Sequence, residues 1–149
     1  MWSRDILNVA KEKKIPILLS IGYASCHWCH VMAHESFEDK ETAEIMNKYF
    51  LNIKVDREER PDLDFVYQNA YSLFNNTAGG WPLTIFLDEN SVPFFAGTYF
   101  PLKESNGLPS FKNILKKVGE IYSQQRDKII VQAPLIKKGL ELKKSSVLK

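Results

Sequence analysis

The feature that most constrains the fold of this chain is a pair of cysteines, Cys26 and Cys29, because the sequence contains no other cysteine. The pair follows directly on a short apolar run at residues 15–21 and a turn at residues 22–25. One loop of four residues cannot staple a fold, so a disulfide-rich scaffold is excluded. The 149 residues, 44% hydrophobic and 26% charged, therefore predict an ordinary globular domain that buries its own apolar core.

Charge is nearly balanced over the chain, with 20 basic and 18 acidic side chains, which argues against a partner nucleic acid. Residues 112–149 carry ten Lys or Arg and three Asp or Glu, so this tail is +7 and the rest of the chain is −5. The uncharged stretches 15–34 and 68–87 contain proline, glycine and polar residues, so neither is expected to cross a membrane. No basic segment followed by an apolar run opens the sequence, so a cytoplasmic location is expected.

Apolar periodicity predicts short strands alternating with helices. Strands are predicted at residues 15–21, 51–55, 83–87 and 92–96, the last two forming a hairpin. Helices are predicted near residues 2–14, after Cys26, after a break at 36–39, at 61–74, at 111–122, and from about Asp127 to Leu142, where Pro134 should introduce a kink or a break. This order predicts an α/β fold with a central mixed sheet covered by helices on both faces, and an extra C-terminal helical segment.

The Cys26-His27-Trp28-Cys29 motif predicts dithiol–disulfide chemistry, because a Cys-x-x-Cys between a buried strand and a helix is the thioredoxin-like arrangement. The thiolate is the species that attacks a disulfide, and reactive cysteines have a pKa of roughly 3.5–7.5 against about 8.5 for a free thiol. The first turn of a helix supplies N–H groups that favour the anion. By position, Cys26 is expected to be the exposed attacking thiol and Cys29 the resolving thiol. His27 and Trp28 are expected to tune the redox potential.

Three other interpretations of the cysteines stay open on the residues alone. Cys26, Cys29 and His30 fit a c-type haem attachment pattern, which needs export and a second axial ligand. The same residues with His34 could ligate zinc, although zinc ligands usually come from two separated pairs. The cysteines could also be reduced and inert, since free cysteine is often a small buried hydrophobe. The redox interpretation is preferred, and with it no metal and no cofactor is expected.

A second element supports the redox interpretation. Gly79-Gly80-Trp81-Pro82 immediately precedes the predicted strand 83–87. Proline is tolerated at the first position of a strand, and an X–Pro bond is where a cis peptide is affordable. In thioredoxin-like folds a cis-proline loop faces the Cys-x-x-Cys and offers its backbone to an extended substrate, whereas a trans proline would simply start the strand. Trp81 and Pro82 are therefore candidate substrate-binding residues, with Trp81 half exposed.

Several blocks in order resemble the thioredoxin-like domain of the spermatogenesis-associated, thioredoxin-like protein family, whose bacterial and archaeal members are mostly uncharacterised. The blocks include the Cys-His-Trp-Cys and Gly-Gly-Trp-Pro motifs and lie at residues 16–23, 26–32, 35–39, 53–62, 79–83 and 97–101. The resemblance runs from about Trp2 to at least Tyr122, nearly the whole chain. It implies a thioredoxin fold with Cys26 and Cys29 as the redox pair and Pro82 as the cis-proline.

The resemblance also implies a division of the chain. Full-length relatives continue after the thioredoxin part into a large helical-barrel domain, so residues 1–126 are expected to form the thioredoxin-like domain. Residues 127–149 are expected to be a helical extension or linker toward that barrel, a partner absent from this chain.

The sequence departs from thioredoxin itself at the position of the buried acid that accepts the proton of the resolving thiol. Ser20 stands there, and Asn52 aligns with the lysine that accompanies the acid. This departure puts efficient general reductase turnover in doubt. His30 or the acidic cluster at residues 56–62 could substitute, but the sequence does not place them near the sulfurs.

Two hypotheses of different class follow. The first is an enzyme, a thiol–disulfide oxidoreductase acting on protein or small-molecule disulfides. The second is a non-catalytic thioredoxin-fold module that docks a partner or the missing barrel. The intact Cys-x-x-Cys favours the first, while Ser20 and the basic tail leave room for the second.

Overall fold

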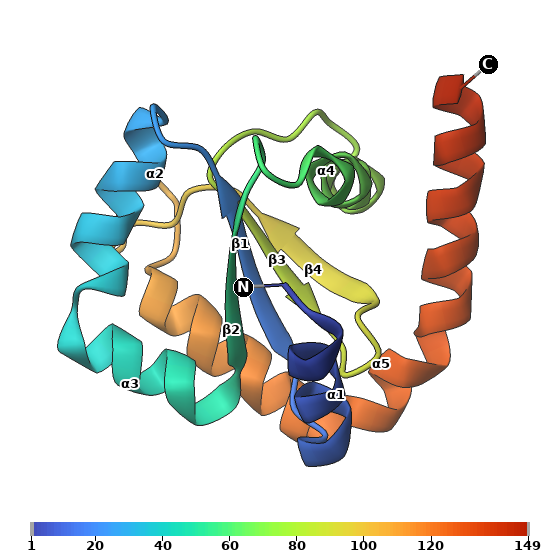
Figure 1. The fold of residues 1–149 in the computed structure, drawn as a ribbon. Helices are drawn as coiled ribbons and strands as arrows, with labels where there is room; N and C mark the ends of the chain where they lie inside the picture. Colours follow the sequence, from blue (N-terminus) through green and yellow to red (C-terminus); the bar gives the residue numbers. More distant parts are fainter. Residues whose placement is uncertain (1, 149) are drawn as a thin grey trace.

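The computed structural model describes residues 2–148, and their side chains as far as residue 141. A four-stranded sheet in the order β2-β1-β3-β4 lies at the centre, with helices on both of its faces (Figure 1). The predicted fold class, α/β with a mixed sheet, is confirmed. The elements are α1 (Arg4–Lys13), β1 (Ile17–Gly22), α2 (His27–Met32), the π-helical turn η1 (Ala33–Phe37), α3 (Lys40–Tyr49), β2 (Leu51–Asp56), α4 (Pro61–Asn75), β3 (Leu83–Leu87), β4 (Pro93–Gly97) and α5 (Phe111–Leu148).

Strand β1 is the buried centre of the sheet. It pairs in parallel with β2 and antiparallel with β3, which pairs antiparallel with β4. A continuous apolar run is what a strand covered on both faces requires, and β1 is such a run apart from Ser20 and Gly22. The pairing places Ser20 beside Lys54 of β2. The carboxyl end of β1 leads directly to the cysteines.

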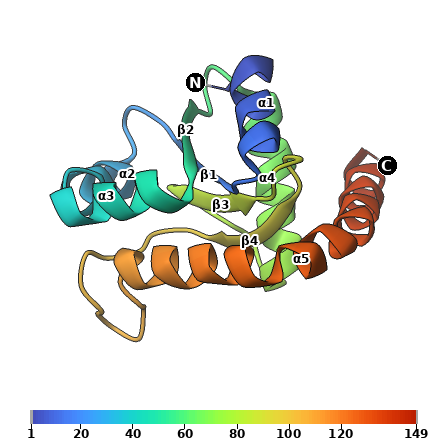
Figure 2. The same ribbon diagram turned by 90° about the horizontal axis from the view of Figure 1, so that it is seen from below.

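Alternation along β1 divides the core into two layers, one on each face of the sheet. Figure 2 shows the sheet and the helices around it from below. Ile17, Leu19 and Ile21 pack with α1 and α4 on one face. Leu18 and Phe86 pack on the other face with α2, η1, α3 and the first part of α5. The helices therefore pack their apolar sides against the two faces of the sheet. This packing fixes the position of β1, and with it the junction between β1 and α2.

Local signals explain where the helices begin. Ser3 caps α1 by accepting the N–H of Ile6, and Asp39 caps α3 by accepting the N–H of Thr42. Pro61 occupies the first turn of α4, as the sequence predicted, where its missing N–H costs nothing. The break predicted at residues 36–39 is therefore the place where η1 ends and where Asp39 caps the start of α3.

Helix α5 consists of two helical segments that meet at a kink at Gln125, close to the boundary between the helices predicted at residues 111–122 and from about residue 127. The second segment runs through Pro134 with helical backbone, so the break predicted at this residue is wrong. A proline inside a helix removes one hydrogen bond, and here the adjacent Ala133 is buried, so packing offsets that loss. Leu140 packs against the core layer of α1 and α4, and in Figure 1 the last part of α5 stands beside α4. The division between residues 126 and 127 falls next to the kink at Gln125 and stays a prediction.

None of the helices in the described part of the chain is long and apolar enough to span a bilayer.

Candidate functional site

Cys26 and Cys29 form a disulfide at the start of α2, with their Cα atoms 5.3 Å apart. Cys26 is the N-cap residue of α2, and its Sγ accepts the backbone N–H of Cys29 at 3.2 Å. Its own N–H donates to the carbonyl oxygen of Tyr23 at 3.1 Å, which closes the turn after β1. The predicted setting between a buried strand and a helix is therefore what the structure contains.

The exposure of Cys26 differs from what was expected. Cys26 is only 3% exposed, so the prediction of an exposed sulfur is wrong for this disulfide state. As the N-cap residue, Cys26 folds its side chain back over the first turn of α2, where it is bonded to Cys29. Cys29 is the partly exposed member of the pair and lines a cavity.

Gly22 is a site residue that the sequence marked only as part of a turn. A Cβ atom built on Gly22 would lie 2.8 Å from Cys29 Sγ and 3.3 Å from Cys29 Cβ. The backbone at the end of β1 therefore lies so close to Cys29 Sγ that only glycine, which has no Cβ atom, fits at this position without a shift. Its place directly before the Cys-x-x-Cys turn is the one sequence signal that could have revealed it.

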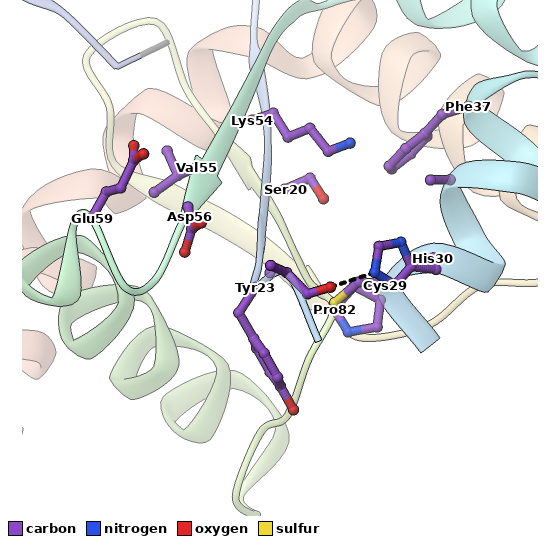
Figure 3. A pocket seen from close by; sticks show the side chains of 13 residues that line it. Ser20, Tyr23, Cys29, His30, Phe37, Lys54, Val55, Asp56, Glu59 and Pro82 are labelled. Carbon is purple, nitrogen blue, oxygen red and sulfur yellow. Dashed lines mark hydrogen bonds between the residues drawn. The ribbon is translucent and has the colours of Figure 1, made fainter. Parts of the chain in front are cut away.

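A cavity of about 370 Å³ opens beside Cys29 (Figure 3). Its polar lining comes from Ser20 on β1, His30 on α2, Lys54 and Asp56 on β2, and Glu59 in the following turn. The sequence alone does not place His30 or the acidic cluster, and the structure brings His30 and two members of the cluster, Asp56 and Glu59, to the cavity. Asn52 is placed differently: it pairs with Leu18, and its side-chain amide donates to the carbonyl of Met46 at 3.1 Å. The residue that pairs with Ser20 across the sheet is instead a lysine, Lys54.

The loop before β3 reaches the same cavity. The Trp81–Pro82 peptide bond is cis, and Pro82 lines the cavity with Cys29. Trp81 is half-buried, and its indole N–H donates to Asp64 Oδ1 at 2.8 Å. The guanidinium of Arg57 lies 4.2 Å from the Trp81 ring centre and 5.2 Å from that of Tyr23. Arg57 therefore holds Trp81 by a cation–π contact, a role that the charged run around it did not reveal.

Trp28 stands out from the surface beside the disulfide. It is 52% exposed, and its ring centre lies 5.0 Å from that of Tyr99 and 5.4 Å from that of His27. The hydroxyl of Tyr99 donates to Glu35 Oε1 at 2.5 Å. Burial, with the bond to Glu35 in support, raises the pKa of Tyr99 to about 12, so this donor stays protonated at neutral pH. Hollows of about 500 and 300 Å³ flank Trp28, the second of them extending to Trp81.

The residues considered for a metal do not converge in the structure. Both sulfurs are used in the disulfide, and His34 is paired with Glu38 at 2.9 Å on the surface. Among residues 2–141, no three His, Cys, Asp or Glu side chains are grouped so as to hold a metal ion.

Relatives of the chain cover it nearly end to end. An uncharacterised protein of Caenorhabditis elegans, B0495.5, is 45% identical over an alignment of 136 positions that covers 87% of this chain and 18% of that protein. Spermatogenesis-associated protein 20 of Homo sapiens is 37% identical over 129 residues, 87% of this chain and 16% of that protein. The chain therefore spans less than a fifth of the length of these relatives.

Solved structures agree on the fold. A disulphide isomerase from Xylella fastidiosa Temecula1 superposes with a TM-score of 0.59 at 18% identity, covering 77% of this chain and 86% of that one. A DsbH oxidoreductase superposes with a TM-score of 0.54 at 17% identity, covering 83% and 82%. These likenesses show a thioredoxin-like fold.

The family model described as "Protein of unknown function, DUF255" (Thioredox_DsbH) matches residues 1–141. The chain belongs to this family of thioredoxin-like proteins, as its resemblance to the spermatogenesis-associated proteins predicted.

Proposed function

We propose that the chain is a thiol–disulfide oxidoreductase module whose Cys26–Cys29 couple exchanges electrons with disulfides of proteins or small molecules. The observation that carries the proposal is the position of the couple. It lies at the β1–α2 junction, beside the Pro82 loop, with one sulfur at an open cavity. A disulfide that served only to tie the chain together would gain little here, because it closes a loop of very few residues.

Cys26 is the attacking thiol in this proposal and Cys29 the resolving thiol. The hydrogen bond from the Cys29 N–H to Cys26 Sγ favours the anionic form of Cys26 once the pair is reduced. Cys29 Sγ lies against Gly22, where no backbone N–H is directed at it among the described residues. Cys26 is nearly buried in the disulfide state, so the reduced pair has to expose it before substrate is attacked.

Substrate contacts fall to the aromatic residues around the couple. The exposed Trp28 and the half-buried Tyr99 form a ring pair on one side of the Gly79–Trp81 loop. Trp81 is fixed on the other side by Arg57 and Asp64. An extended polypeptide laid along the hollow between Trp28 and Trp81 would contact apolar ring faces and reach the backbone next to Pro82. His27, whose ring lies against Trp28, is proposed to tune the couple together with it.

A second candidate, a non-catalytic docking module, is favoured by one observation. Val131 and Leu135 on α5 are 75% and 74% exposed, although Ala133 between them is buried. Such an apolar strip fits a contact with a further part of a longer protein, of which this chain matches only a fraction.

Reduction of insulin disulfides by dithiothreitol distinguishes the two candidates. The oxidoreductase proposal predicts that the wild-type chain accelerates insulin precipitation and that Cys26→Ser abolishes the acceleration. His34→Gln, an exposed change outside the couple, serves as the matched control and should leave the rate unchanged. If wild type and Cys26→Ser give the same rate, the docking candidate replaces the enzyme.

A further inference from the structure

The cavity beside Cys29 contains more chemistry than a disulfide needs. Five titratable side chains line it together with the sulfur, and they come from separate parts of the fold: Tyr23 before α2, His30 on α2, Lys54 and Asp56 on β2, and Glu59 after β2. Ser20 adds a hydroxyl from the centre of the sheet, directly beside Lys54 in the strand pairing. Cys26 is not among the lining residues, so this chemistry is directed at one of the two sulfurs.

A resolving thiol has to lose its proton before it can attack a mixed disulfide. The hydroxyl of Ser20 can relay a proton between neighbouring groups, because it both donates and accepts hydrogen bonds. It is too weak a base to be the final proton acceptor. The acceptor must therefore be one of the titratable groups at the cavity, and its basicity decides how fast Cys29 reacts near neutral pH.

The hydrogen bond of His30 defines which of its nitrogens is free. His30 Nε2 lies 2.5 Å from the carbonyl oxygen of Ala24. A carbonyl oxygen only accepts, so Nε2 carries the hydrogen, and in the neutral ring Nδ1 is left as the basic nitrogen. Figure 3 shows this contact as the dashed line, with the imidazole next to Cys29. Imidazole is also the side chain whose charge changes nearest to neutral pH.

The other groups at the cavity are less suited to take the proton. A carboxylate is in general a weaker base than imidazole. Asp56 Oδ1 in addition already accepts the N–H of Glu58 at 2.8 Å. Lysine and tyrosine hold their own protons at neutral pH. The ammonium of Lys54 lies over the Phe37 ring on the cavity wall, where it adds a positive charge to the lining of the cavity.

We propose that His30 accepts the proton of the Cys29 thiol and that Lys54 stabilises the thiolate so formed. The proposal rests on the oxidoreductase function. The Cys26 thiolate attacks a substrate disulfide, forms a mixed disulfide and releases the first substrate thiolate. Cys29 then transfers its proton to His30, and its thiolate attacks Cys26 Sγ. The Cys26–Cys29 disulfide forms, the second substrate thiolate leaves with the electron pair, and His30 returns the proton to it or to water. An external dithiol reduces the couple again.

Single-turnover kinetics separate the two attacks. The reduced protein is mixed with a stoichiometric amount of 5,5′-dithiobis(2-nitrobenzoate), and each attack releases one coloured thiolate. Cys29→Ser should show the first phase only. His30→Gln should leave the first phase unchanged and slow the second at least about tenfold at pH 7, with the difference vanishing above about pH 9, where the thiol ionises unaided. His34→Gln is the matched control.

A second variant tests whether His30→Gln slows the reaction only by disturbing the structure. Ser20→Asp, added to His30→Gln, places a new acceptor on the cavity wall and should restore part of the second phase at pH 7. Lys54→Met should slow alkylation of Cys29 in a Cys26→Ser background, whereas Lys48→Met, a lysine on α3 outside the cavity, should not. An unchanged second phase in His30→Gln, or equal slowing of both phases, overturns the proposal. A wild-type protein without either phase refutes the oxidoreductase function itself.

Discussion

The backbone N–H of Cys29 donates a hydrogen bond to Cys26 Sγ at 3.2 Å, and this bond makes the two sulfurs chemically unequal. A sulfur that receives an N–H is stabilised as an anion, so in the reduced protein Cys26 should be the more reactive thiol. Iodoacetamide at neutral pH should label Cys26 before Cys29, as read by peptide mass spectrometry. Cys29→Ser should accumulate a mixed disulfide with substrate and Cys26→Ser should not. Faster labelling of Cys29 would reverse the assignment of the two thiols.

Gly22 gives a test of the packing around the couple. Gly22→Ala would place a Cβ atom 2.8 Å from Cys29 Sγ, so the sulfur or strand β1 has to move. The oxidised protein should lose about 1–3 kcal/mol of unfolding free energy, the usual cost of overpacking. Gly80→Ala is the matched control, because a Cβ atom added there would meet no atom of a more distant residue within 4 Å. Denaturant unfolding of both variants measures the effect, and equal stability would show that Cys29 is not held against β1.

Trp28 should contribute to polypeptide substrates more than to small ones. Its exposed ring, backed by Tyr99, offers a face that a peptide can cover, whereas a small disulfide needs only the sulfur. Trp28→Ala should lower kcat/KM for insulin about tenfold, equivalent to about 1.4 kcal/mol, and leave the first phase with the small aromatic disulfide nearly unchanged. Phe65→Ala, an exposed aromatic on α4, is the control. A loss of the same size with both substrates would assign Trp28 to the chemistry rather than to binding.

Arg126 fastens α5 to the β3–β4 turn through Glu89. Its guanidinium donates to both carboxylate oxygens, at 2.5 and 2.8 Å, and Tyr122 donates to one of them at 3.0 Å. Arg126→Met should cost about 2 kcal/mol of unfolding free energy at pH 7, because the carboxylate is buried. The exposed Arg60–Asp62 pair supplies the control, and Arg60→Met should leave the unfolding free energy nearly unchanged.

The same contact predicts a pH dependence. The hydrogen bonds from Arg126 hold the pKa of Glu89 below its usual value, against the opposing effect of burial. A carboxyl with a lowered pKa in the folded state contributes stability above its unfolded pKa of about 4.3, and loses that contribution as the pH falls. The difference in stability between wild type and Arg126→Met should therefore be full near pH 7 and shrink toward about pH 3. A difference that grows on acidification would contradict this origin.

Truncation tests where the folded unit ends. Removing residues 127–149 should lower the Tm by many degrees, because Ala133 is buried and Leu140 packs on the core beside α4. The double variant Val131→Ser, Leu135→Ser changes only exposed side chains of the same segment and should leave the Tm unchanged. A truncated chain that melts like the full one would mean that the segment acts through a partner, as the sequence-based division at residue 126 proposed.

The sheet and the order of its helices were predictable because they depend on local patterns. Short apolar runs mark β1 to β4, and Asp39 and Pro61 mark helix starts without reference to the rest of the fold. The continuation of α5 through Pro134 was not predictable, because it depends on packing against an element distant in sequence. Propensity at one residue is outweighed by such packing.

The two cysteines of the candidate site could be predicted from the sequence, but the residues that surround them could not. Cys26 and Cys29 are identified by spacing, whereas Lys54 and Glu59 reach the cavity only through the pairing of β2 with β1. The burial of Cys26 depends on how its side chain folds over the first turn, which no spacing reveals. Arg57 is likewise explained by the rings that it contacts and not by its charged neighbours in the chain.

The midpoint potential of the Cys26–Cys29 couple tests the central claim most directly. The protein is equilibrated in dithiothreitol or glutathione buffers of graded potential, and the fraction oxidised is read by alkylation and mass spectrometry. A couple that cycles with substrates should give one two-electron transition above about −300 mV, within the range of catalytic Cys-x-x-Cys pairs of about −270 to −120 mV. A midpoint below about −300 mV, typical of structural disulfides, would contradict the claim that this pair is a working redox centre.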